Sequence, residues 1–294
     1  MILIAGGTGR LGSLVANQLC ERGLNVRVLS RGLKPDPDIL LDGIEVVAGD
    51  VRDPTGLTAA LEGVDVVLSA VQGFMGLDGV TPETVDRMGN INLVAAAESV
   101  GADIVMMSVI GASPDSPMEL FRMKYAAEQR LLDSTTSWTV VRSDAYAETW
   151  LAVLEETAGK SGRPLVFGRG DRPISWVSVH DVAALVELAV TDSSLRGRIL
   201  EICGPEPVTL TELAARFMSE RGVAGKPRRV PRLMLHVVAG TVGRVRPTMR
   251  RQARASLAMD VLPTSDGAAT RAEFPDLPST PVSAVVEATL VEAD

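Results

Sequence analysis

The first twelve residues, Met1-Ile-Leu-Ile-Ala-Gly-Gly-Thr-Gly-Arg-Leu-Gly12, decide how the chain folds. The apolar run Met1–Ala5 has the length of one buried strand of a parallel sheet. It ends at Gly6, and apolar residues at helical spacing begin at Leu11. The order is therefore strand, glycine-rich turn and helix, which predicts an α/β fold.

The glycine-rich turn has the chemistry of a phosphate site. Its glycines follow a G-x-x-G-x-x-G spacing at the first strand–helix junction, and a second apolar strand, Asn25–Ser30, comes next. Glycine lets the backbone close on a ligand, and the helix N-terminus offers free N–H groups to an anion. A glycine-rich turn without a nucleotide is the alternative, but the strand–turn–helix context favours dinucleotide binding. The predicted cofactor contacts in this turn are Gly6, Thr8, Gly9, Arg10, Leu11 and Gly12.

Short apolar strands and amphipathic helices alternate through the first half of the chain. The predicted strands are Met1–Ala5, Asn25–Ser30, Glu45–Ala48, Val64–Ala70, Asp103–Ser108 and Trp138–Arg142. The predicted helices are Leu11–Arg22, Pro54–Leu61, Pro82–Val100 and Glu119–Ser134. This alternation predicts a doubly wound parallel sheet of the Rossmann type. We expect residues 1–145 to form an NADP(H)-binding core. Residues 146–294 are expected to add late core strands and helices and a smaller substrate-binding lobe.

Polar and small residues follow several of these strands, where ligands of such sheets bind. Arg31 comes directly after the second strand, where an arginine suits the 2′-phosphate of NADP(H) better than the ribose of NAD(H). A solvated surface arginine is the alternative. Asp50 follows the third strand and could accept a hydrogen bond from the adenine amino group. The remaining cofactor candidates, after the third and fourth strands, are Val51, Ala70, Val71 and Gln72.

Composition narrows the classes of protein. The chain has 294 residues, of which 46% are hydrophobic and 22% charged, as in ordinary globular proteins. A net charge of −8 argues against general affinity for nucleic acid or an anionic membrane. Cys20 and Cys203 are too few for a disulfide scaffold and are expected to be buried. No secretory leader is visible, and no apolar run reaches the ~20 residues of a membrane span, so a cytoplasmic protein is expected.

One basic stretch stands out in this acidic chain. Residues 221–259 contain ten Lys and Arg residues and no Asp or Glu. The ordinary explanation is solvated helix faces, and the alternative is a surface for an anionic substrate or partner. Two scattered histidines without an H-E-x-x-H motif argue against a metal enzyme, so no metal ligands are predicted.

Several motifs together carry a family resemblance. They are Gly6–Gly12 after the first strand, Gly49-Asp50-Val51, Lys124 with Glu128, Ser178–Ala183 and Gly204-Pro205-Glu206. With these motifs the chain resembles the atypical short-chain dehydrogenase/reductases, and within them the NmrA-like group. That group includes isoflavone-reductase-type enzymes, type 2 quinone oxidoreductases and redox-sensing regulators.

The resemblance implies an active-site lysine without the usual tyrosine. Tyrosine-dependent members place the catalytic tyrosine four residues before the lysine, and here Leu120 occupies that position. Lys124 matches the lysine of isoflavone-reductase-type relatives, where it would anchor the nicotinamide ribose. A plain surface pair with Glu128, one helical turn on, is the alternative. The proton would come from Lys124, Tyr146 or water, and Ser108 at the end of the fifth strand completes the catalytic candidates.

These features predict an NADP(H)-dependent oxidoreductase that passes hydride to a small apolar or conjugated carbonyl, quinone or enone acceptor. A sensor that binds NADP(H) without turnover is the alternative, and an epimerase is disfavoured because such enzymes need the Tyr–Lys pair. We expect a small-molecule substrate, no nucleic-acid or membrane partner, and a monomer or homodimer.

Overall fold

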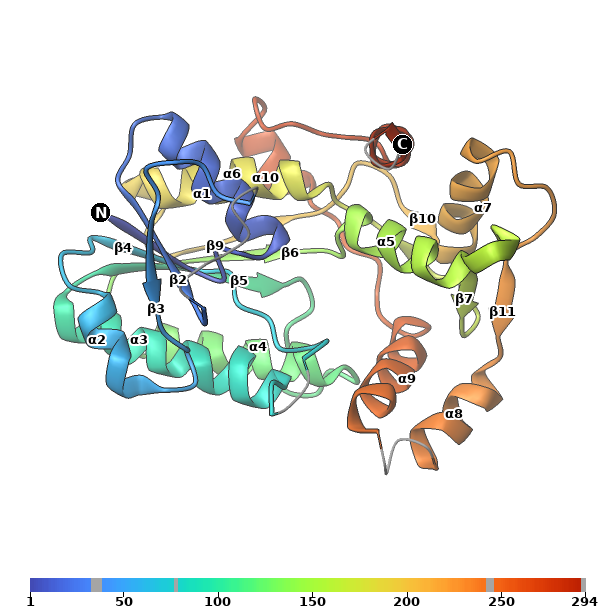
Figure 1. Ribbon diagram of the computed structural model, residues 1–294, viewed down its shortest axis with the longest axis horizontal. Coiled ribbons are helices and arrows are strands. Elements are labelled where there is room, and N and C mark those ends of the chain that lie inside the picture. The colour runs from blue at the N-terminus through green and yellow to red at the C-terminus, as the bar shows by residue number, and fades with distance from the viewer. Residues whose placement is uncertain (33–38, 77–78, 242–245, 292–294) are drawn as a thin grey trace. The chain divides into compact units, whose positions relative to one another are not determined.

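The computed structural model describes residues 1–32, 39–76, 79–241 and 246–291 (Figure 1). Within these residues, seven strands form one sheet in the order β3-β2-β1-β4-β5-β6-β9. Their bounds are β1 (Ile2–Ala5), β2 (Val26–Ser30), β3 (Glu45–Ala48), β4 (Val66–Ser69), β5 (Asp103–Val109), β6 (Trp138–Ser143) and β9 (Arg198–Ile202). The pairs β1–β2, β1–β4, β2–β3 and β4–β5 are parallel. The predicted doubly wound α/β fold is confirmed.

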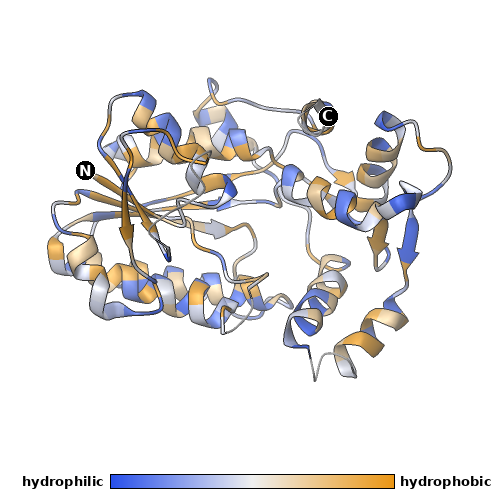
Figure 2. Ribbon diagram, viewed as in Figure 1, coloured by the Kyte–Doolittle hydropathy of each residue, from blue (hydrophilic) through white to orange (hydrophobic). Residues whose placement is uncertain are grey.

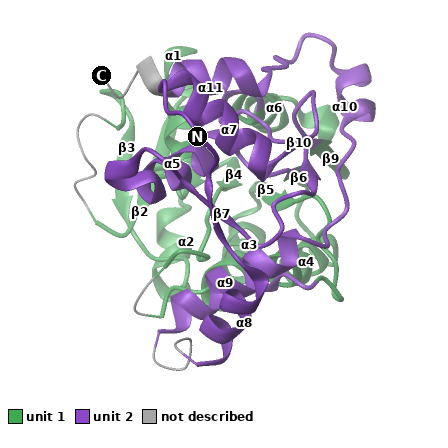
Figure 3. Ribbon diagram, turned by 90° about the vertical axis from the view of Figure 1, so that its right-hand side faces the viewer, with its two compact units in different colours: residues 1–116, 120–142, 182–201 green, residues 117–119, 143–181, 202–294 purple. Residues whose placement is uncertain are grey.

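The chain divides into two compact units (Figure 3). Unit 1 comprises residues 1–116, 120–142 and 182–201, and unit 2 comprises residues 117–119, 143–181 and 202–294. The chain therefore leaves unit 1 after β6 and returns to it with α6 and β9, so each unit is built from segments that are distant in sequence.

Unit 1 is layered around its sheet. The helices are α1 (Arg10–Glu21), α2 (Leu57–Ala60), α3 (Met88–Val100), α4 (Glu119–Leu132) and α6 (Val179–Thr191), with the 3₁₀ turns η1 (Pro54–Gly56) and η4 (Ser193–Leu195). Helices α1 and α6 lie on one face of the sheet, and α2, α3 and α4 lie on the other. All four residues of β1 are buried, as a parallel strand covered on both faces requires. Figure 2 shows this apolar character along the strands.

Unit 2 has its own core. Its strands pair as β7 (Leu165–Phe167) with β11 (Arg228–Val230) and β8 (Pro173–Ile174) with β10 (Val208–Thr209). Its helices are α5 (Ala147–Ala158), α7 (Leu210–Glu220), α8 (Arg232–Gly240), α9 (Pro247–Met259), α10 (Ala268–Glu273) and α11 (Val282–Val291), with the 3₁₀ turn η3 (Gly159–Ser161). Trp176 is fully buried, and its indole donates to the carbonyl of Val208 at 2.7 Å. This hydrogen bond satisfies the polar edge of the largest side chain of the core.

Two local features differ from the sequence-based expectations. The helix expected over Pro82–Val100 is present, but it begins with a π-helical turn, η2 (Pro82–Arg87), before α3. Cys20 is half-buried, with its thiol near the carbonyl of Asp42, whereas Cys203 is buried as predicted.

Candidate functional site

The turn between β1 and α1 lies against the end of β4. Gly6 has a φ of +86°, and a Cβ there would lie 2.7 Å from the carbonyl oxygen of Ala70. A Cβ on Gly12 would lie 2.2 Å from the carbonyl oxygen of Gly6, to which the Gly9 N–H donates at 3.0 Å. Both positions therefore require glycine, because a side chain would clash with the backbone after β4 at Gly6 and with the turn itself at Gly12.

The N-terminus of α1 is open to a ligand. Gly9 is its N-cap and supplies no side-chain cap, and the first turn carries no acidic residue. Thr8 and Arg10 are exposed, whereas Leu11 is buried. The first N–H groups of the helix thus lack side-chain acceptors and make an anion site of the kind that holds a pyrophosphate.

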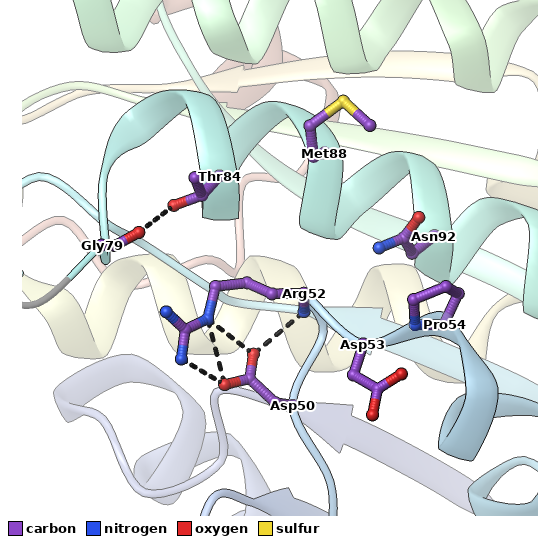
Figure 4. A pocket seen from close by; sticks show the side chains of 8 residues that line it. All are labelled: Asp50, Arg52, Asp53, Pro54, Gly79, Thr84, Met88 and Asn92. Atoms are coloured by element: carbon purple, nitrogen blue, oxygen red, sulfur yellow. Dashed lines mark hydrogen bonds and ion pairs between the residues drawn. The ribbon is translucent and has the colours of Figure 1, made fainter.

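A pair of charges follows β3. Arg52 clasps the carboxylate of Asp50, with Nε 3.0 Å from both oxygens and Nη2 2.6 Å from Oδ2 (Figure 4). The Arg52 guanidinium holds the pKa of Asp50 below its usual range, and the charge of Arg31, beyond β2, acts in the same direction. Arg31 is exposed. Sequence reasoning singled out Arg31 and Asp50 as cofactor candidates but not Arg52, although its position two residues after Asp50 in a turn was an available signal.

A hollow of about 590 Å³ opens beside this pair. It is lined by Asp50, Arg52, Asp53, Pro54, Gly79, Thr84, Met88 and Asn92. Asn92 on α3 donates from Nδ2 to the carbonyl of Val51 at 2.8 Å. This bond ties α3 to the segment after β3 and fixes one wall of the hollow.

Lys124 is buried, with only 5% of its side chain exposed. Its Nζ donates to the carbonyl of Val71, just after β4, at 3.0 Å and lies 3.1 Å from Oδ1 of Asp86. Glu128 is instead clasped by Arg142, with 2.6 Å between Oε2 and Nη2. The alternative of a surface pair between Lys124 and Glu128 is therefore wrong, because Lys124 points toward the end of β4.

Asp86, which sequence reasoning missed, belongs to a buried polar network in unit 1. Its Oδ2 accepts from the Gly73 N–H at 2.8 Å, and its carbonyl accepts from Asn90 Nδ2 at 2.7 Å. Asn90 in turn accepts from the hydroxyl of Ser69 at 2.5 Å. Burial raises the pKa of Asp86, and the charge of Lys124 opposes that rise. The only sequence signal was an acidic residue on a predicted helix, which usually indicates an exposed face.

The other two catalytic candidates lie in different units. Ser108 in β5 is 3% exposed, and its buried Oγ has no hydrogen-bond partner among the described residues. Tyr146, the N-cap residue of α5 in unit 2, accepts from the Ser143 hydroxyl at 3.4 Å. Burial raises the pKa of Tyr146 to about 12, so its hydroxyl keeps its proton at neutral pH. The structure thus places Ser108 and Lys124 in unit 1 and Tyr146 in unit 2.

Comparison with known proteins identifies the family. A family profile described as NAD(P)H-binding matches residues 6–193. The chain belongs to this NAD(P)H-binding family. It is 31% identical over 231 residues to the NAD(P)H azoreductase of Xenophilus azovorans, covering 78% of this chain and 76% of the relative. The prediction of an NAD(P)H-binding chain with relatives among NAD(P)H-dependent reductases is confirmed.

Two further relatives extend the match. A (4-alkanoyl-5-oxo-2,5-dihydrofuran-3-yl)methyl phosphate reductase of Streptomyces griseus is 31% identical over 236 residues, covering 79% of this chain and 77% of the relative. The structure of Escherichia coli quinone oxidoreductase QOR2 with NADPH aligns with a TM-score of 0.80 at 23% identity. It covers 99% of this chain and 100% of the other, which confirms the fold.

The residues present fit a nicotinamide dinucleotide. Gly6 and Gly12 leave no room for a Cβ, the N-terminus of α1 is uncapped, and the buried Ser108 hydroxyl has a hydrogen bond left to make. Within the described ranges, no three His, Cys, Asp or Glu side chains gather as metal ligands. None of the described helices has the length and apolar character to cross a membrane.

Proposed function

We propose that this NAD(P)H-binding protein is an NADPH-preferring reductase of quinones, azo compounds or conjugated carbonyls. The observation that carries the proposal is the Lys124 ammonium, buried and held at the end of β4, against which the glycine turn also packs. A fixed positive charge beside a dinucleotide-binding turn suits the reduction of an acceptor that gains negative charge as hydride arrives.

Binding of the cofactor is assigned to three groups of residues. Backbone N–H groups of the turn from Gly6 to Gly12 would hold the pyrophosphate. The adenosine would lie toward the hollow beside Asp50 and Arg52, with Arg31 contacting the 2′-phosphate. The cofactor would lie close to the sheet along the residues that follow β3 and β4, which are Val51, Ala70, Val71 and Gln72.

Chemistry at the acceptor follows from the same side chains. Bound NADPH would supply the hydride. The Lys124 ammonium has three N–H donors and uses at most two of them, on Val71 and Asp86. The remaining N–H would donate to the nicotinamide ribose or the acceptor. Ser108 would add a neutral donor, and the final proton would come from Lys124, Tyr146 or water.

The relatives favour conjugated acceptors. Their names describe an azoreductase, a furanone phosphate reductase and a quinone oxidoreductase. Each of these acceptors spreads the incoming electron pair over several atoms, so reduction needs less acid catalysis than reduction of a simple ketone. This agrees with Leu120 in the place of the usual tyrosine. Residues 146–294 are proposed to provide the apolar contacts of the acceptor.

Binding of NADP(H) without turnover is the second candidate, and the missing tyrosine is the observation that favours it. The test is the loss of NADPH absorbance with purified protein and a panel of a benzoquinone, an azo dye, an enone and a simple ketone, with NADH in parallel. We expect turnover with the conjugated acceptors and a preference for NADPH. NADPH binding seen by fluorescence, with no turnover on any acceptor, would decide for the sensor, and faster reduction of the ketone would overturn the acceptor class.

A further inference from the structure

We propose that Asp86 is a positioning residue for Lys124: its carboxylate keeps the Lys124 ammonium charged and aimed at the reacting groups. The proposal rests on the proposed function, since it assigns Lys124 to the active site. Both side chains are almost fully removed from solvent, because Asp86 is 0% exposed and the side chain of Lys124 is 5% exposed. A lysine this deeply buried needs a counter-ion to remain charged.

The Asp86 carboxylate is itself held in one orientation. Oδ2 accepts from the backbone N–H of Gly73, which leaves Oδ1 to face Nζ of Lys124. The Lys124 N–H that donates to Val71 holds the ammonium from a second side. One hydrogen bond to Val71 and the ion pair with Asp86 thus hold the ammonium from two segments, and Oδ1 of Asp86 accepts no hydrogen bond among the described residues, so Lys124 keeps N–H groups for a ligand.

The local backbone explains how an acid reaches this position. Asp86 lies in the π-helical turn η2, and π-helical turns are frequently found at functional sites. Asn90 fixes the turn by donating to the Asp86 carbonyl while it accepts from Ser69 at the end of β4. The wide turn and this bridge together seat the carboxylate beside the sheet.

No other described charge competes for Lys124 or Asp86. On η2, Arg87 pairs with Glu83 at 2.6 Å. On α4, Glu128 is clasped by Arg142 of β6. The segment after β4 contributes backbone groups of Val71 and Gly73, and α3 contributes the neutral Asn90. Within the described residues, Lys124 and Asp86 are therefore each other's counter-ion.

The test is a direct titration of Lys124. The chain has four lysines, so NMR of ¹³Cε-labelled lysine gives few signals, and Lys124→Arg assigns the one of interest. In Asp86→Asn, the titration midpoint of that signal should fall by at least about 1 pH unit relative to the native chain, because the buried ammonium has lost its counter-ion. The alkaline limb of the pH–kcat profile should move by the same amount, with activity regained at lower pH.

Control variants distinguish the effect of losing the Asp86 charge from an effect on packing. Ser69→Ala removes one hydrogen bond from the same network and keeps the charge of Asp86, so it should move the Lys124 midpoint much less than Asp86→Asn does. Asp86→Glu, which restores the carboxylate, should return the midpoint toward the native value. If Asp86→Asn does not fold, the double variant Asp86→Asn/Lys124→Gln should fold again, because removing both charges is tolerated where removing one is not.

Three outcomes would overturn the proposal. They are an unmoved midpoint in folded Asp86→Asn, an equal loss of activity at every pH, and a double variant that is no more stable than the single one. The titration needs neither cofactor nor acceptor. A moved midpoint in a protein without turnover would reject the proposed function and leave the ion pair established, whereas turnover with an unmoved midpoint would reject the role of Asp86 alone.

Discussion

Each unit contains a fully buried aspartate, and the two are used differently. In unit 2, Asp181 accepts from Thr280 twice, through the backbone N–H at 2.9 Å and the hydroxyl at 2.6 Å, and Arg271 lies 3.5 Å away. In unit 1, Asp86 faces Lys124, which keeps an unused N–H, and the buried hydroxyl of Ser108 has no partner among the described residues.

The difference teaches that a buried charge alone does not mark a functional site. The carboxylate of Asp181 is occupied by its contacts with Thr280, and both residues belong to unit 2, so its role is to hold unit 2 together. In unit 1, by contrast, the Lys124 ammonium and the Ser108 hydroxyl can each still donate a hydrogen bond. Unused hydrogen-bonding capacity in a buried place is costly unless a ligand uses it. Arg271 Nε, beside Asp181, also lacks a hydrogen-bond partner among the described residues, so what separates the site from the scaffold is the position of Lys124 at the end of β4, against which the glycine turn packs.

The largest effect on this comparison is expected from a substitution that blocks the glycine turn of unit 1. Gly12→Ala places a Cβ 2.2 Å from the Gly6 carbonyl oxygen and should displace the helix from the turn. We expect at least about a 100-fold loss of NADPH affinity, since two or more charge-assisted hydrogen bonds to the pyrophosphate would be lost. Fluorescence titration measures this. Gly56→Ala, where no atom lies within 4 Å of the new Cβ, is the matched control and should bind normally.

Asp181→Ala tests the other side of the comparison. It leaves the Thr280 N–H unsatisfied and Arg271 without its acidic partner, and should lower the free energy of unfolding by about 3 kcal/mol. Denaturant unfolding measures the loss, and NADPH affinity of the folded protein should stay within about twofold of the native value. A large loss of affinity at unchanged stability would erase the distinction between the two aspartates.

The sequence predicted the parts of this site that obey local rules. The strand–turn–helix order of the first twelve residues, and the position of Arg31 and Asp50 after their strands, follow from spacing alone. Lys124 was found through family resemblance. Asp86 was not singled out because its partner Lys124 lies 38 residues away and no periodicity encodes a π-helical turn. Arg52 lies only two residues from Asp50, and that proximity was a signal left unused.

Within unit 1, Arg31 should distinguish NADPH from NADH, whereas Arg52 should contribute equally to the binding of both cofactors. Arg31→Ala should weaken NADPH binding about 10- to 100-fold and leave NADH binding nearly unchanged, because one charge-assisted contact with the 2′-phosphate is lost. Arg52→Ala should weaken both cofactors equally, since the adenosine is common to them. Parallel titrations with NADPH and NADH measure both. If Arg31→Ala weakened NADPH and NADH binding equally, Arg31 would be a solvated surface residue and not a contact for the 2′-phosphate.

Two capping boxes give the smallest and most closely matched test. Thr209 caps α7 in unit 2 with Glu212, and Thr81 caps η2 in unit 1 with Thr84. Replacing either threonine by alanine should cost about 1 kcal/mol in the free energy of unfolding. Because η2 carries Asp86, only Thr81→Ala should also lower kcat, by a few-fold, whereas Thr209→Ala should leave turnover unchanged. If both variants lose the same stability but only Thr81→Ala changes kcat, the active geometry of Lys124 depends on the π-helical turn. If kcat is identical in both variants, the turn tolerates fraying without an effect on turnover.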